Sequence, residues 1–124
     1  MHEGPVVLFA GGGTGGHLYP ALNIAHALRC RRPNVRVVFM GATRGIEARI
    51  LPQKGEEHFL LPVRGLDRGL RGAFWRTIPA LATSLLEAAR VMRRLQPGAV
   101  VITGGYASAP AGVIAAFTGV PLLI

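Results

Sequence analysis

Five short apolar runs, each separated from the next by a stretch with helical spacing, constrain the fold of this 124-residue chain more than any other feature. Near-continuous apolar runs are typical of parallel strands covered on both faces, and parallel strands require crossover helices. The sequence therefore predicts a single α/β domain built on a doubly wound parallel sheet. The five runs lie at Val6–Ala10, Val35–Met40, His58–Leu61, Ala99–Ile102 and Val120–Ile124.

The stretches between these runs predict four helices, at Pro20–Arg31, Arg44–Gln53, Phe74–Leu95 and Ala109–Phe117. Pro20 is expected in the first turn of its helix, where the missing N–H of proline removes no hydrogen bond. Pro79 predicts either a kink in the third helix or a fresh start there. The fifth run is expected to be a buried central strand. Because the chain stops there, at Ile124, we expect it to be one half of a larger protein.

Composition excludes several classes of protein. Half of the residues are hydrophobic and only 16% are charged, which argues against a disordered chain. The single cysteine, Cys30, excludes an internal disulfide framework, and the four histidines lack zinc-binding spacing, so we expect no bound metal. The sequence shows no signal-peptide pattern and no apolar run near 20 residues, so we expect no membrane-spanning segment.

A formal net charge of +8 predicts an anionic partner, namely nucleic acid, an anionic membrane surface or phosphate. The stretch Arg64–Arg76 mixes arginines with leucines and aromatic residues, which suits an anionic bilayer surface. A solvated loop with buried leucines is the alternative. No RNP, KH or helix-turn-helix pattern supports a nucleic-acid partner. The predicted membrane-contact residues are Leu70, Arg71, Phe74, Trp75 and Arg76.

A glycine-rich turn joins the first apolar run to the first helix, with the sequence Gly11-Gly12-Gly13-Thr14-Gly15-Gly16-His17. Its glycines let backbone N–H groups approach a ligand, and the helix N-terminus adds partial positive charge, so the turn is predicted to bind a phosphate or an oxyanion. A helix N-terminus also favours the neutral imidazole. His17 is therefore a candidate general base, although a hydrogen bond to its own loop would explain it as well.

A second glycine turn follows the fourth run, at Thr103-Gly104-Gly105-Tyr106-Ala107-Ser108. The strand order should place it beside the first turn, and two such turns at a switch point form a cleft for a phosphorylated ligand. Tyr106 and Ser108 are candidate ligand contacts, or else a packing residue and a helix cap. Gly11, Gly13 and Gly16 also match a dinucleotide fingerprint, but residues 40–44 lack its acidic residue.

The two turns together closely resemble those of the MurG family, the glycosyltransferases that move N-acetylglucosamine from UDP-GlcNAc onto lipid I to form lipid II in peptidoglycan synthesis. The resemblance covers the whole chain and is carried by three motifs: Ala10-Gly11-Gly12-Gly13-Thr14-Gly15-Gly16-His17-x-x-Pro20, Gly104-Gly105-Tyr106-x-Ser108-x-Pro110 and Gly41-x-x-x-Gly45-Ile46-Glu47.

This resemblance implies a GT-B enzyme with two Rossmann-like domains, an inverting transferase that needs no cofactor. Residues 1–124 would be the N-terminal acceptor-binding domain, inactive alone, and the C-terminal donor-binding domain would be absent. The whole enzyme would lie peripherally on the cytoplasmic face of the bacterial inner membrane. The alternatives are a non-catalytic membrane-associated subunit and a nucleotide-binding Rossmann domain.

The resemblance also implies roles for residues of both turns. His17 would be the catalytic base in the intact enzyme. Thr14, Gly15 and Gly16 would contact the donor, UDP-GlcNAc. The acceptor diphosphate of lipid I would bind to Gly12, Gly13, Gly104, Gly105, Tyr106 and Ser108.

Overall fold

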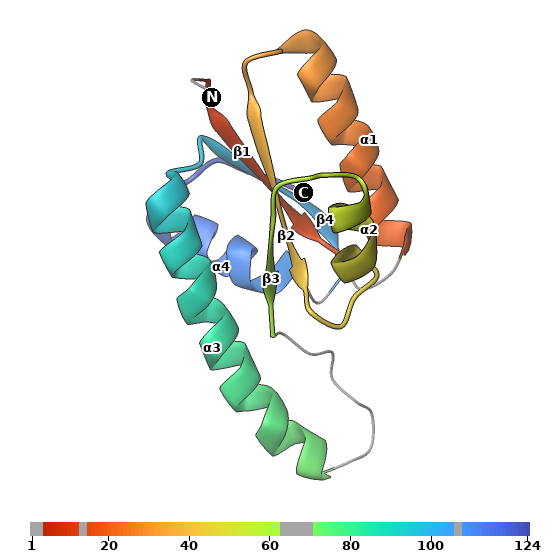
Figure 1. Cartoon of the computed structure of the whole chain (residues 1–124). Helices are drawn as coiled ribbons and strands as arrows, with labels where there is room; N and C mark the ends of the chain where they lie inside the picture. The colour runs from red at the N-terminus through yellow and green to blue at the C-terminus, as the bar shows by residue number, and fades with distance from the viewer. Residues whose placement is uncertain (1–3, 13–14, 63–70, 106–107) are drawn as a thin grey trace.

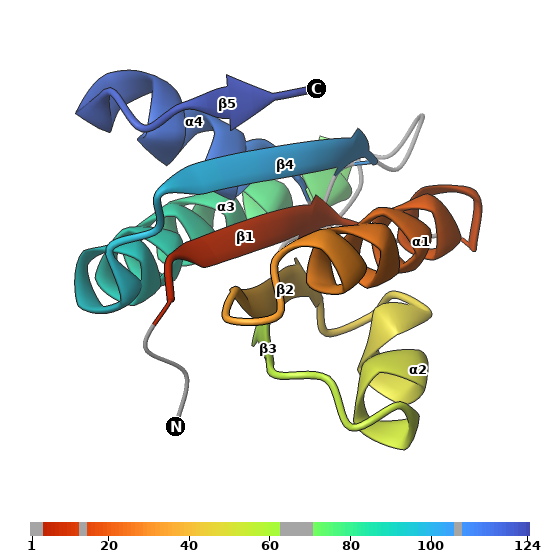
Figure 2. The same ribbon diagram turned by 90° about the horizontal axis from the view of Figure 1, so that it is seen from above.

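Strands and helices alternate along the chain and form one parallel sheet with helices on both faces (Figures 1 and 2). The computed structural model describes residues 4–12, 15–62, 71–105 and 108–124, with the backbone alone for 71–78, 80 and 81. The elements are β1 (Val6–Gly11), α1 (Gly15–Arg31), β2 (Arg36–Ala42), α2 (Glu47–Gln53), β3 (His58–Leu61), α3 (Arg71–Leu95), β4 (Ala99–Gly104), α4 (Ala109–Thr118) and β5 (Leu122–Leu123). The predicted doubly wound α/β architecture is confirmed.

The sheet has the strand order β3-β2-β1-β4-β5, with every neighbouring pair parallel. The chain therefore starts at the centre, winds outward through β2 and β3, and then crosses back to β4 on the other side of β1. The switch point lies between β1 and β4. Ligands of open α/β sheets bind beyond the carboxyl ends of the strands at such a point.

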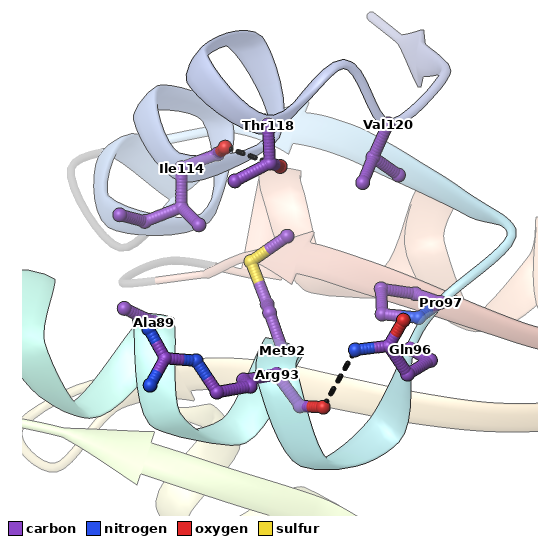
Figure 3. Close-up of a pocket in the computed structure, with 8 residues that line it drawn as sticks. All are labelled: Ala89, Met92, Arg93, Gln96, Pro97, Ile114, Thr118 and Val120. Atoms are coloured by element: carbon purple, nitrogen blue, oxygen red, sulfur yellow. Dashed lines mark hydrogen bonds between the residues drawn. The ribbon is translucent and has the colours of Figure 1, made fainter.

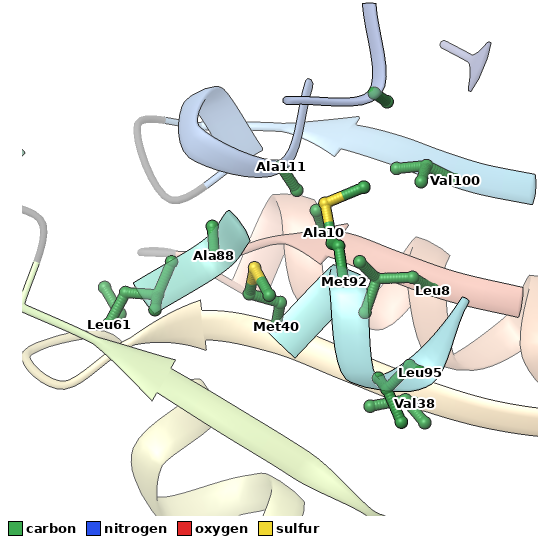
Figure 4. Close-up of a cluster of buried hydrophobic side chains, with 12 residues drawn as sticks. Leu8, Ala10, Val38, Met40, Leu61, Ala88, Met92, Leu95, Val100 and Ala111 are labelled. Carbon is green, nitrogen blue, oxygen red and sulfur yellow. The ribbon is translucent and has the colours of Figure 1, made fainter. Parts of the chain in front are cut away.

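Successive side chains of β1 point into two separate cores. Leu8 and Ala10 belong to the cluster in Figure 4, which α3 and α4 cover with residues such as Met92. Phe9 faces the opposite side, beneath α1 and α2, and its ring centroid lies 5.6 Å from that of Phe39 on β2. Burying a side chain of this size contributes roughly 1.5–3 kcal/mol. The apolar runs are nearly continuous because both faces of the sheet are covered.

The helix α1 begins at Gly15, so the expectation that Pro20 lies in the first turn is wrong. Leu18 is buried in the same core cluster as Ala21 and Ala25, so the apolar face of the helix extends upstream of the proline. Burial of Leu18 draws the last residues of the glycine turn into helical geometry. His17 therefore lies within the first turn of α1 rather than before it.

Two other helices also differ from expectation. Helix α2 begins at Glu47 rather than near Arg44, because residues 43–46 form the turn that follows β2. Helix α3 begins at Arg71 rather than at Phe74 and continues to Leu95. Of the two expectations for Pro79, a fresh helix start is therefore wrong. Three residues of α3, Ala88, Met92 and Leu95, are buried against the sheet.

The fifth run forms the two-residue strand β5 at Leu122–Leu123. In the described part of the sheet β5 is an edge strand that pairs only with β4, whereas β1 is central. Leu123 is 60% exposed and Ile124 is 98% exposed.

Candidate functional site

The two glycine turns lie side by side at the carboxyl edge of the sheet, as the strand order predicts. The described residues of the first glycine turn are Gly11, Gly12, Gly15 and Gly16, and those of the second are Gly104, Gly105 and Ser108. The backbone N–H of Gly12 donates to the carbonyl oxygen of Gly104 at 3.4 Å. A direct backbone contact thus joins the two turns at the switch point.

A bulge at the end of β4 shapes the second turn. Ala10 lies opposite Ile102 and Gly11 lies opposite Gly104, so Thr103 is the extra residue on β4. Bulges of this kind redirect groups next to functional sites. The hydroxyl of Thr103 is buried, and it has no hydrogen-bond partner among the described residues.

His17 connects α1 to this bulge. Its Nδ1 lies 3.1 Å from the carbonyl oxygen of Thr103. Because a carbonyl only accepts hydrogen bonds, Nδ1 carries the proton in this contact, and Nε2 of the neutral ring is left able to accept one. The ring is half-buried. This hydrogen bond joins His17 to the other glycine turn. The alternative expectation, a hydrogen bond from His17 to its own loop, is not what the structure shows.

The second turn requires glycine because His17 and Gly12 pack directly against its backbone. Gly104 and Gly105 have φ angles of +107° and +84°, which side chains rarely adopt. A Cβ on Gly104 would lie 2.8 Å from Nδ1 of His17, and one on Gly105 would overlap the carbonyl oxygen of Gly12. The glycines therefore allow the two turns and the imidazole to meet.

Ser108 closes the second turn. Its hydroxyl donates to the carbonyl oxygen of Gly105 at 2.7 Å, and the residue is 7% exposed. It stands at the N-cap position of α4 but makes no side-chain capping hydrogen bond. The expected cap is therefore wrong in its bonding: Ser108 has helical backbone angles (φ −83°, ψ −18°) instead of the extended ones of a capping residue, and its hydroxyl donates to the turn that precedes the helix.

Glu47, which was not among the predicted site residues, reaches the first glycine turn from α2. Its side chain is fully buried, and Oε1 accepts the backbone N–H of Ala42 at 2.7 Å. A Cβ on Gly12 would overlap its carboxylate. The sequence feature that could have identified Glu47 is its position close to Gly41 and Gly45. These two glycines have no side chains, and this leaves room for the Glu47 carboxylate.

Glu47 also bears on the dinucleotide alternative. A ribose-binding acid would have to present its carboxylate to the ligand, but that of Glu47 is 0% exposed and is packed against Gly12. This acid beyond β2 therefore fills space inside the fold instead of offering a ligand contact.

Several predicted site residues lie outside the described residues. These are Gly13, Thr14, Leu70 and Tyr106. The backbone of α3 includes four further membrane-contact candidates whose side chains are likewise not described: Arg71, Phe74, Trp75 and Arg76. Gly15 and Gly16 open α1 beside the turn.

An apolar pocket of about 320 Å³ lies elsewhere, between α3 and α4 (Figure 3). Met92, Ile114 and Val120 line it together with Gln96 and Pro97. Gln96 and Pro97 precede β4, and Val120 precedes β5. The pocket therefore lies at the amino edge of the sheet, opposite the glycine turns. It does not contribute to the candidate site.

Neither a membrane-spanning helix nor a metal-binding cluster occurs in the described segments. No helix there is both long enough and apolar enough to cross a bilayer. No group of three or more histidine, cysteine or acidic side chains in those same residues is placed to hold a metal ion.

Comparison with known proteins adds a family and several relatives. Residues 7–124 match the model of the glycosyltransferase family 28 N-terminal domain. The chain is 44% identical, over 95% of its length, to a Moorella thermoacetica protein named UDP-N-acetylglucosamine--N-acetylmuramyl-(pentapeptide) pyrophosphoryl-undecaprenol N-acetylglucosamine transferase. It is also 44% identical, over 96% of its length, to the Thermus thermophilus protein of the same name. It spans 32% and 34% of those two relatives.

A solved structure gives the same comparison in three dimensions. The crystal structure of Acinetobacter baumannii MurG superposes with a TM-score of 0.73 at 28% sequence identity. The match covers 96% of this chain and 33% of that protein. The chain thus resembles about one third of each of these relatives.

Proposed function

Because the chain belongs to glycosyltransferase family 28, whose N-terminal domain model matches residues 7–124, we propose that it is the acceptor-binding domain of an N-acetylglucosaminyltransferase. The whole enzyme would transfer GlcNAc from UDP-GlcNAc to lipid I and form lipid II. A C-terminal domain outside residues 1–124 would supply most of the donor site. The observation that carries this proposal is the His17 contact that joins two glycine turns at the sheet's switch point.

The geometry supports an anion site between the two turns. The lipid I diphosphate would bind at Gly12, Gly13, Gly104, Gly105, Tyr106 and Ser108. Gly104 and Gly105 offer backbone without side chains there, and Gly105 is exposed. Backbone N–H groups and the adjacent ends of α1 and α4 stabilise negative charge without a bound cation.

His17 would act as general base on the acceptor hydroxyl. An inverting transfer needs this proton removed while the UDP leaves, and its charge must be stabilised. The Thr103 carbonyl holds the proton on Nδ1, so Nε2 is the nitrogen that would accept the hydroxyl proton. Thr14, Gly15 and Gly16 would contact the departing UDP from the first turn of α1.

The enzyme would work at the cytoplasmic face of the bacterial inner membrane. Its acceptor carries an undecaprenyl chain, and the net charge of +8 favours an anionic surface. Leu70, Arg71, Phe74, Trp75 and Arg76, at and just before the start of α3, would make this contact.

The proposal is tested by incubating the whole protein with radiolabelled UDP-GlcNAc and a short-chain lipid I analogue. We expect label in a product that contains both sugars, formed only when the analogue is present. Release of UDP without transfer, or no reaction by a folded protein, would contradict the proposed activity. Binding of NAD or NADP in place of the sugar nucleotide would instead favour the dinucleotide alternative.

A further inference from the structure

Glu47 is a buried acid that the proposed mechanism does not use. Glu47 is 0% exposed. By contrast, Glu57, which lies just before β3 and forms an ion pair with Arg36, has a side chain that is 40% exposed. A carboxylate is costly to bury unless its oxygens receive hydrogen bonds or a charge partner. Glu47 therefore needs hydrogen-bond donors at fixed positions around it. The same hydrogen bonds hold the donor groups in place.

The carboxylate lies between two turns at the carboxyl edge of the sheet. Its Oε1 accepts the N–H of Ala42 at the end of β2, and a Cβ on Gly45 would overlap that same oxygen. Its Oε2 faces the first glycine turn, where it is the atom nearest to a Cβ built on Gly12. The carboxylate of one side chain thus lies against both the β2–α2 turn and the first glycine turn.

Gly12 transmits this contact to the second glycine turn. Its N–H donates to the carbonyl oxygen of Gly104, and its own carbonyl oxygen packs against Gly105. Both of those glycines pack against the ring of His17. A continuous path of contacts therefore leads from the buried acid to the proposed catalytic histidine.

We propose that Glu47 is a positioning residue that fixes the first glycine turn, and through Gly12 the spacing of both turns, for binding of the acceptor diphosphate. This role rests on the proposed function, because it gives the two turns a ligand. Glu47 touches no substrate itself. A purely structural acid would hold α2 to β2, and its loss would reduce the amount of folded protein without changing substrate binding.

The test compares Glu47→Gln with Glu57→Gln in the whole protein. Both variants neutralise one carboxylate, but Glu57 lies just before β3, at the amino edge of the sheet away from the turns. Glu47→Gln keeps the size of the side chain and replaces one acceptor oxygen with a donor. We expect the KM for a short-chain lipid I analogue to rise by roughly 10-fold in Glu47→Gln, which corresponds to a loss of about 1.4 kcal/mol of binding free energy. Glu57→Gln should keep the native KM.

A lower yield of active enzyme with an unchanged KM would overturn the positioning role, because that is what a structural acid predicts. If Glu47→Gln does not fold, Glu47→Asp takes its place, since it keeps the charge and shortens the reach by one methylene. A native KM in Glu47→Asp would equally overturn the proposal.

A second readout needs no transfer. Amide hydrogen exchange at Gly12, Gly104 and Gly105 should speed up in the Glu47 variant and not in Glu57→Gln. Unchanged exchange at all three amides would overturn the proposal even if activity fell. If the unaltered protein transferred no sugar, the proposed function would fail, whereas exchange at these glycines would still decide whether Glu47 positions the turns.

Discussion

At the scale of single residues, His17 joins the two glycine turns, and we propose that it also acts as the general base. Its Nδ1 contact with the Thr103 carbonyl spans the two glycine turns, and the same contact leaves Nε2 to take a proton. Changing the residue removes both roles at once unless the substitute retains a donor. Two different substitutions are therefore needed to separate them.

His17→Ala should lower kcat of the whole protein by on the order of 100-fold or more, as expected for loss of a general base. His17→Asn retains an N–H donor for the Thr103 carbonyl but provides no base. Its kcat should therefore fall by as much as that of His17→Ala. Steady-state transfer assays measure both. His26→Ala, on an exposed position of the same helix, is the control and should be as active as the unaltered protein. Native turnover in His17→Asn would show that His17 only joins the turns.

Gly105 and Gly55 form a matched pair for testing the glycine turns. Both have positive φ, at +84° and +68°, but only Gly105 has atoms in the way of a side chain. Gly55→Ala should cost about 1–2 kcal/mol of unfolding free energy from the backbone conformation alone. Gly105→Ala should cost more, because its Cβ also overlaps the Gly12 carbonyl, and it should weaken acceptor binding. Equal losses in urea unfolding would contradict the close approach of the two turns.

The glycine-rich spacing predicted the place of the candidate site, because glycines between a strand and a helix open the backbone to a ligand. It did not predict how the site is held. The bulge at Thr103 depends on register between β1 and β4, which no local pattern records. Glu47 was missed for a similar reason, since its contact with Gly12 joins residues 35 positions apart, across two strands.

At the scale of elements, the helices are predicted in number and approximate place but not at their ends. Patterns of apolar residues show which face is buried, whereas helix ends depend on contacts such as that of Leu18 with the core. As a result α1 includes Pro20 at its sixth residue, beyond the turn where proline is tolerated without loss. The carbonyl of Gly16 is left without the N–H that residue 20 would otherwise donate.

Pro20→Ala should therefore stabilise the chain by about 1–3 kcal/mol, because it restores a helical N–H and removes a steric conflict. The gain should appear as a higher urea midpoint with an unchanged slope. Pro110 lies in the first turn of α4, where an N–H has no helical partner, so Pro110→Ala should show no such gain. If the two changes had the same effect, the position of Pro20 within α1 would not be the cause.

At the scale of the whole molecule, charge and topology were the most predictable features. The α/β architecture follows from the alternation of runs and helices, and the adjacency of β1 and β4 follows from the doubly wound pattern. The net charge of +8 is a property of the entire chain and predicts an anionic partner, namely nucleic acid, an anionic membrane surface or phosphate.

The whole protein should sediment with vesicles that contain anionic lipid and not with purely zwitterionic vesicles. Raising the salt from about 0.05 to about 0.5 M should release most of it, because screening weakens contacts between exposed charges. Trp75→Ala should lower binding at fixed salt if this residue contacts lipid. Equal binding to both kinds of vesicle would contradict an electrostatic contribution.

The most direct test of the central claim is an NMR titration of this chain with a short-chain lipid I analogue, followed through backbone amides. We expect shifts at the carboxyl edge of the sheet, led by Gly12, Gly104 and Gly105, with UDP-GlcNAc alone giving much weaker changes. Shifts confined to the amino edge around Arg93 and Gln96, or none in a folded chain, would contradict the assignment of the paired glycine turns as the acceptor site.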